Sequence, residues 1–334
     1  MKNRVFKFFL FLLLVCSTII AYLYFQTTAQ AWGFWAHQRI NRLAVFTLPP
    51  DMIVFYKKHI EFVTEHAVDP DKRRYAVEDE APRHFIDLDH YVKEPPYDIL
   101  PHRWEDAVKE RTEDTLKSYG VVPWHTEVMF YRLRNAFENR DQNKILRYSS
   151  DIGHYIADGH VPLHTSENYN GQMTNQKGIH GFWESRIPEL FGNDYDFWVG
   201  KAEYIRNPRE FIWQYIIESH NALDSVLVFE RELNAEYPSD QKYCYENRGV
   251  QTMQVYCEGY ATDYAKMLNG MQERRMRDAI LAVGSLWYTA WVDAGQPDLD
   301  KILPIPPTEE EIEEMKTMEA KFQEGKIKGR PEPH

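Results

Sequence analysis

Apolar residues recur at intervals of three and four along most of the chain, the spacing that places them on one face of an α-helix. Sustained alternation of apolar and polar residues, the signature of a half-buried strand, is not found. Prolines stand where the helical segments are expected to begin or stop. The pattern predicts an all-α fold, a single multi-helix domain with long loops at about 67–102 and 160–180. Its helices are expected at 34–47, 50–66, 103–119, 122–139, 141–158, 208–233 and 249–292.

The pattern changes at both ends of the chain. At the start, three basic residues precede an apolar run over 8–25, and Ala29-Gln30-Ala31 follows. This order is typical of a signal peptide, so we expect residues 1–31 to be removed on export to the periplasm or the exterior. The run is also close to the length that spans a bilayer, and an uncleaved membrane anchor is the alternative. The main domain then covers 32–303, followed by a charged, proline-containing tail over 304–334.

Composition and charge narrow the function. Of 334 residues, 43% are hydrophobic and 14% aromatic, which suffices for a sizeable core and excludes a disordered chain. Loss of the leader removes three basic residues and no acidic one, which takes the formal charge from -12 to -15. A polyanion must therefore be bound locally, because the chain has no global positive field. The two cysteines left after export, Cys244 and Cys257, are expected to form a structural disulfide.

One histidine-rich stretch stands out among the thirteen histidines of the chain, His154-Tyr-Ile-Ala-Asp158-Gly-His160-Val-Pro162-Leu-His164. Residues four apart lie on one face of a helix, so His154 and Asp158 can share a metal ion. Pro162 ends the helix and turns His164 back towards them. Random placement of residues is expected to give a His-x3-Asp-x5-His pattern only about 0.08 times in a chain of this composition. The stretch predicts a metal site, in which His160 either orients a ligand or caps the helix.

The same stretch resembles the signature of the zinc-dependent phospholipase C and type I single-strand nuclease superfamily, secreted all-α enzymes with three zinc ions in one cleft. Members begin, after signal removal, with a tryptophan whose amine and carbonyl bind zinc, and the expected mature chain begins at Trp32. Two further elements look like those of the family, and the resemblance covers about residues 32–184. These elements are Arg83-His84-Phe85-Ile86-Asp87 and His180-Gly-Phe-Trp-Glu184.

The resemblance implies three zinc ions in a cleft lined by helix faces and the mature N-terminus. The first ion needs an aspartate upstream of His84. Asp69 is slightly preferred because it keeps the nuclease-like distance to His84, whereas Asp71 better keeps the aspartate's relation to a downstream Arg-Tyr pair. The implied ligands are Asp69 or Asp71, His84, His154 and Asp158 for the first ion, Trp32, His37 and Asp158 for the second, and His164, His180 and Glu184 for the third.

The implied reaction is hydrolysis of a phosphodiester. Zinc lowers the pKa of a bound water towards neutrality, so that this water can attack phosphorus while other ions neutralise the phosphate oxygens. The resemblance makes Asp69 or Asp71 the acceptor of the water's proton, and Asp158 the carboxylate that bridges two ions. The candidate substrate contacts are Trp35, Arg74, Phe85 and Asp87.

Some residues resemble the phospholipase branch of the superfamily. Glu184 stands where the nucleases have aspartate, and the interval between His164 and His180 is short. Trp35, however, occupies the position at which phospholipases carry an acidic residue that helps to hold choline. These residues point to the phospholipase branch without predicting choline selectivity.

Other residues resemble the nuclease branch, namely the offset between Trp32 and His37 and the motif His160-x-Pro162-Leu163-His164. No basic groove with interleaved aromatic residues is apparent for a single strand. We therefore expect a phospholipase C-like enzyme that acts on a phospholipid or another phosphodiester, with a membrane surface as a possible partner and no obligate protein partner. A single-strand nuclease or 3'-nucleotidase acting on single-stranded nucleic acid is the alternative. A membrane-anchored, non-catalytic helical protein is the alternative of another class.

Overall fold

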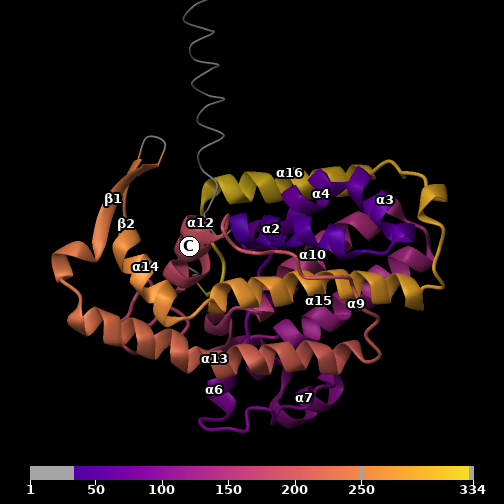
Figure 1. The fold of residues 1–334 in the computed structure, drawn as a ribbon. Coiled ribbons are helices and arrows are strands. Elements are labelled where there is room, and N and C mark those ends of the chain that lie inside the picture. Colours follow the sequence, from indigo (N-terminus) through magenta and orange to yellow (C-terminus); the bar gives the residue numbers. More distant parts are fainter. Residues whose placement is uncertain (1–33, 249–250, 331–334) are drawn as a thin grey trace, which may run out of the picture.

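A computed structural model of the chain describes residues 34–248 and 251–330 (Figure 1). Over these residues the protein is all-α apart from one two-stranded hairpin, as the helical periodicity predicts. The expected leader at 1–31, the alternative anchor at 8–25 and Trp32 lie outside the described residues. None of the helices in the described part combines the length and the apolar character needed to cross a bilayer.

Helix α10 (Gln142–Gly159) forms the centre of the bundle and is buried along most of its length. Among the helices that pack against it, four contribute much of the main hydrophobic core (Figure 1). They are α2 (Phe34–Ala44), α9 (Val122–Glu138), α13 (Pro208–Glu236) and α15 (Met271–Asp293).

The contact between α2 and α10 is especially close at Gly153. A Cβ atom there would lie 1.9 Å from Oδ1 of Asn41, so no larger residue fits without displacing this side chain. The Asn41 amide donates to the carbonyl oxygens of Ser150 at 3.1 Å and Val63 at 3.2 Å. These hydrogen bonds fix α2 against α10. His37, one turn before Asn41 on α2, thereby faces the buried polar side of α10.

Short helices complete the bundle and the loops that were expected around it. Around the first loop lie α3 (Pro50–Lys58), α4 (Ile60–Glu65), α5 (Asp69–Arg73), α6 (Leu88–Tyr91), α7 (Trp104–Arg111) and α8 (Glu113–Ser118). The second loop contains a 3-10 turn (Pro162–Thr165), α11 (Ile179–Gly181), a π-helical turn (Phe182–Arg186) and α12 (Ile187–Phe191).

The expectation of one helix over 249–292 is wrong at its start. Strand β1 (Tyr243–Arg248) pairs antiparallel with β2 (Gln251–Tyr256), and the helix begins only at α14 (Glu258–Met267). The expected disulfide between Cys244 and Cys257 is present and joins the open ends of the hairpin. Asn269 and Gly270, both with positive φ, then separate α14 from α15.

A second, smaller core lies between the hairpin, α14 and the far half of α13. It includes Leu163 and Phe182, and the Phe182 ring stacks on Tyr256 with ring centroids 3.9 Å apart. This core anchors the segment 161–187, which carries three of the expected metal ligands. The last helix, α16 (Glu309–Glu324), runs along the α2 and α4 side of the bundle (Figure 1).

Candidate metal centre

Buried histidines and carboxylates converge at one place in the fold. Within each of three groups, the ligand atoms lie within 4.8 Å of one another, so each group could hold a metal ion. No member side chain belongs to a residue more than 5% exposed. The groups are His37, His154 and Asp158, then Asp71, His84 and His154, and finally His164, His180 and Glu184.

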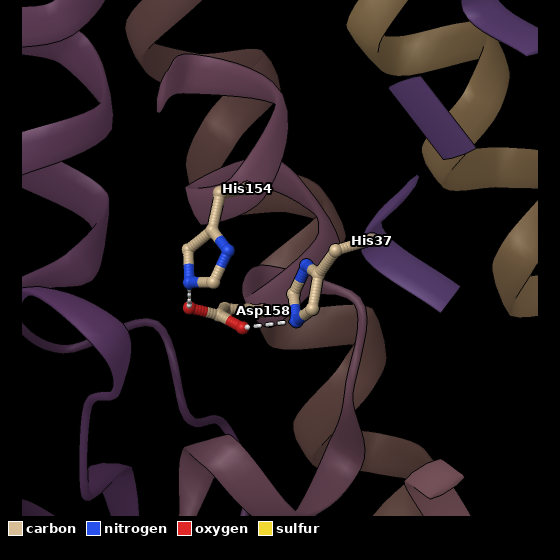
Figure 2. Close-up of side chains that lie close together, drawn as sticks. All are labelled: His37, His154 and Asp158. Atoms are coloured by element: carbon tan, nitrogen blue, oxygen red, sulfur yellow. Dashed lines mark ion pairs between the residues drawn. The ribbon is translucent and has the colours of Figure 1, made fainter. Parts of the chain in front are cut away.

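Asp158 is the carboxylate around which these groups assemble. It projects from α10 one turn after His154, and His37 approaches it from α2 (Figure 2). Its Oδ2 lies 3.2 Å from Nε2 of His154 and its Oδ1 lies 3.5 Å from Nε2 of His37. The helical spacing of four therefore places both α10 side chains at one site, as the sequence predicts.

The second group is built from α5 and the 3-10 turn Ala81–His84. Oδ1 of Asp71 lies 3.7 Å from Nδ1 of His84 and 3.6 Å from Nε2 of His154. Nδ1 of His84 is also 3.0 Å from Oδ2 of Asp158. Asp158 thus faces ligand atoms of both groups, which is the arrangement expected of a bridging carboxylate.

The structure places Asp71 beside His84, whereas the sequence slightly favoured Asp69. Asp69 turns away and pairs with His66 at 2.6 Å and Lys72 at 3.5 Å. Both aspartates belong to α5, in which residues two apart point to nearly opposite sides, so only one of them can face His84. Burial would raise the pKa of Asp69, but the hydrogen bond and charge of His66 lower it.

The third group contains the expected residues His164, His180 and Glu184. Pro162 starts the 3-10 turn that follows α10 and carries His164 back to the site. His180 and Glu184 are four residues apart on continuous helical backbone, with 2.7 Å between Nε2 and Oε2. The two histidine Nε2 atoms are 3.2 Å apart.

The hydrogen bonds of the rings show which nitrogen faces the centre. Nδ1 of His154 donates to the carbonyl of Ala67 at 2.9 Å. Nδ1 of His164 donates to the carbonyl of His84 at 2.6 Å, and Nδ1 of His180 to that of Tyr169 at 3.2 Å. A carbonyl accepts only, so a neutral ring carries its proton on Nδ1 and presents a lone pair on Nε2. The facing Nε2 atoms of His164 and His180, with Oε2 of Glu184 beside them, could therefore hold a cation.

The pKa values of the carboxylates and histidines at the centre depend on one another. Burial would raise the pKa of Asp158, but His154 and His164 hold it well below its usual value. Burial would likewise lower the pKa of His154, yet Asp158 and Asp71 raise it to about 9. Oδ2 of Asp71, Nδ1 of His37 and Nε2 of His84 are buried without a hydrogen-bond partner among the described residues. Of these atoms only Oδ2 of Asp71 belongs to a group that a cation at the centre could engage, because His37 and His84 turn their other ring nitrogens, Nε2 and Nδ1, to the carboxylates.

A buried network that sequence reasoning missed supports the second group. Glu80 accepts hydrogen bonds from Arg83 at 2.6 Å and from the Tyr155 hydroxyl, and it lies 3.5 Å from Arg73. Its Oε1 is 3.8 Å from Nε2 of His84. This distance is longer than a hydrogen bond, so Glu80 acts on His84 through its negative charge. The signal available in the sequence was an acidic residue four positions before His84.

The four candidate substrate contacts have different surroundings. Phe85 and Asp87 follow His84 and meet Arg330, whose guanidinium lies 4.1 Å from the Phe85 ring centroid and 2.7 Å from Oδ1 of Asp87. Arg74 is buried and donates to the carbonyl of Arg330. Trp35 instead packs beside Gly192 at the end of α12.

His160 lies outside the three groups. Its Nδ1 donates to the Ile156 carbonyl at 2.7 Å and its ring stacks on Tyr215. Of the two roles considered for His160, its contacts correspond to capping the end of α10.

Comparison with known proteins assigns no family. None of the models of protein families matches the chain. A search of curated proteins likewise finds no match. The superfamily resemblance therefore stays a prediction that rests on the residues quoted above.

Proposed function

We propose that the three groups bind three zinc ions and that the protein is a phosphodiester hydrolase of the zinc-dependent phospholipase C and type I nuclease superfamily. The observation that carries the proposal is the convergence of five imidazoles and three carboxylates, Asp158 among them, in one buried site. The orientation of three rings by carbonyl oxygens, with Nε2 left for a cation, supports it further.

The ligand set fits zinc better than a harder cation. Imidazole and carboxylate suit zinc, whereas calcium and magnesium prefer oxygen ligands alone. Ligands of a tetrahedral zinc, at about 2.0–2.2 Å from the ion, are separated from one another by about 3.3–3.6 Å. The distances from His37 to Asp158, from Asp71 to His154 and from His164 to Glu184 are 3.5, 3.6 and 3.3 Å.

Each residue would then have a defined task. Bound zinc supplies an acidified water and neutralises phosphate charge. Asp71 accepts the proton of the attacking water at Oδ2, the carboxylate oxygen without a hydrogen-bond partner. Asp158 holds two metal positions together, and burial of the whole cluster keeps bulk water out. Export and removal of residues 1–31, which would free the amine of Trp32 as a further ligand, belong to the same proposal.

Phospholipids are the first candidate substrates. Arg330 is held by the faces of Phe85 and Tyr169 and by the Asp87 carboxylate, beside the cluster. Two ring faces and a carboxylate suit a quaternary ammonium head group. Two ring faces also stack a nucleobase, which keeps a single-strand nuclease as the second candidate.

The test is a comparison of the zinc-loaded mature protein on phosphatidylcholine, other phospholipids, single-stranded DNA and bis(p-nitrophenyl) phosphate, with Asp158→Asn as the inactive control. The expected result is that the wild type hydrolyses phospholipid and Asp158→Asn does not. Hydrolysis of DNA without phospholipid would replace the first candidate by the second. A zinc-loaded protein that cleaves none of the four substrates would refute the proposed function and leave the non-catalytic alternative.

A further inference from the structure

The C-terminal segment folds back across the bundle, and its last described residue, Arg330, lies beside the candidate metal centre. Helix α16 lies on the α2 and α4 side (Figure 1), where the Phe322 ring contacts Tyr75, with ring centroids 5.1 Å apart, and Phe34, at 6.3 Å. Beyond the helix, the backbone nitrogen of Lys328 donates to the Arg74 carbonyl at 2.9 Å. Its side chain donates to the Ala76 carbonyl at 3.0 Å.

The segment delivers one side chain, Arg330, into a set of partners built for a cation. The guanidinium carbon lies 3.6 Å from the Tyr169 ring centroid and 4.1 Å from that of Phe85. Its nitrogens donate to Oδ1 of Asp87 at 2.7 Å and to the Ser166 carbonyl at 3.0 Å. The side chain is only 14% exposed, so ring faces, carboxylate and carbonyl together replace its water.

Every partner of Arg330 belongs to a segment that carries a metal ligand. Phe85 follows His84, and Ser166 lies two residues after His164. The carbonyl of Tyr169 accepts the Nδ1 hydrogen bond of His180. With Arg330 in place, the eight ligand residues are at most 5% exposed. A substrate the size of a phospholipid or an oligonucleotide therefore needs a covering segment to move.

We propose that residues 304–330 are an intramolecular strap that closes the metal centre, with Arg330 occupying the place of a cationic or planar part of the substrate. The docking of Arg330 does not depend on the proposed function, whereas the inhibition of hydrolysis by the strap rests on it. Release of the strap opens Phe85, Tyr169 and Asp87 to an external ligand.

The packing of α16 suits a segment that detaches. The structure describes every side chain of α16 except that of Glu311, and none of those described is buried. A cavity of about 280 Å³ separates Met315 and Met318 of α16 from Phe62 and Leu146 of the bundle. An element with few buried apolar contacts opens at a lower free energy than the core does. The strap is therefore held chiefly by its far end, where Arg330 docks.

The test compares Arg330→Ala in the full chain with Lys326→Ala, which removes the same charge from an exposed position of the same segment. Hydrogen–deuterium exchange needs neither zinc nor activity. Peptides that contain Phe85 and Ser166–Tyr169 should exchange faster in the Arg330 variant only. With bis(p-nitrophenyl) phosphate, kcat/KM of that variant should rise about tenfold, the effect of losing a contact of this kind.

The outcomes separate the strap from the proposed function. Exchange and kcat/KM that are equal in the wild type and both variants would overturn the strap. Faster exchange with no hydrolysis in any variant would overturn the inhibitory role and the proposed function together. An equal response of the two variants would also overturn the proposal, since it would assign the effect to net charge rather than to the docked guanidinium.

Discussion

Glu80→Gln tests how far the network behind His84 supports the centre. The Glu80 side chain is fully buried, and its carboxylate is shared by Arg73, Arg83 and the Tyr155 hydroxyl. Burial alone would raise its pKa, but these cations and His84 lower the pKa to about 2. Against the ordinary value of 4.5, this corresponds to ~3 kcal/mol in favour of the folded protein with an ionised carboxylate.

The sign of the pH dependence follows from the lowered pKa. The stabilisation is fully present above the unfolded-state pKa of about 4.5 and is lost as the pH falls towards about 2. Glutamine keeps the shape but has no charge, so the variant should be less stable by ~3 kcal/mol near neutral pH. The difference should shrink in acid, where the wild-type carboxylate is also neutral.

Urea denaturation at several pH values measures this difference, and zinc titration measures the effect on the metal site. Loss of the negative charge that faces Nε2 of His84 should weaken zinc binding. Glu61→Gln is the matched control, because Glu61 is 69% exposed in its pair with Arg42 and should change stability by no more than about 0.5 kcal/mol. Equal stabilities of the two variants at neutral pH, or a difference that does not depend on pH, would refute the reasoning.

Three further predictions concern the centre and the strap. Asp71→Asn should lower the zinc content of the purified protein and Asp69→Asn should not, as metal analysis will show; the reverse result would restore the sequence-based preference. Asp158→Asn should abolish hydrolysis and reduce bound zinc, whereas His220→Ala, which changes a side chain bonded to Thr165, should do neither. Burial, with Asp89 and Glu167 nearby, raises the pKa of Asp87 to about 6, although Arg330 lowers it. The strap should therefore loosen as the pH falls through about 6, because a protonated Asp87 no longer pairs with Arg330. Hydrogen exchange of the strap amides, corrected for intrinsic rates, should become faster there, and equal protection on both sides of that pH would contradict this.

The helices and the ligands on them were predictable because both depend on local spacing. His154 and Asp158 lie on one face of α10 by helical geometry, and the same spacing joins His180 to Glu184. The hairpin was not predictable in this way. Its strands hold together through pairing and the Cys244–Cys257 disulfide, and Gln251–Tyr256 carries no strong strand pattern of its own.

Other features depend on contacts between distant parts of the chain. The choice between Asp69 and Asp71 is decided by the rotation of the short helix α5 against α10, which spacing along the chain does not specify. The strap contact joins Arg330 to Asp87 across 243 positions. The sequence predicted only a charged, proline-containing tail, because a single arginine within it carries no signal of its partners.

Zinc content of the mature protein tests the central claim most directly. N-terminal sequencing of the purified protein should find Trp32 as the first residue. Inductively coupled plasma mass spectrometry of the same sample should find close to three zinc ions per chain. One zinc ion or none, in a folded protein that begins at Trp32, would contradict the trinuclear centre.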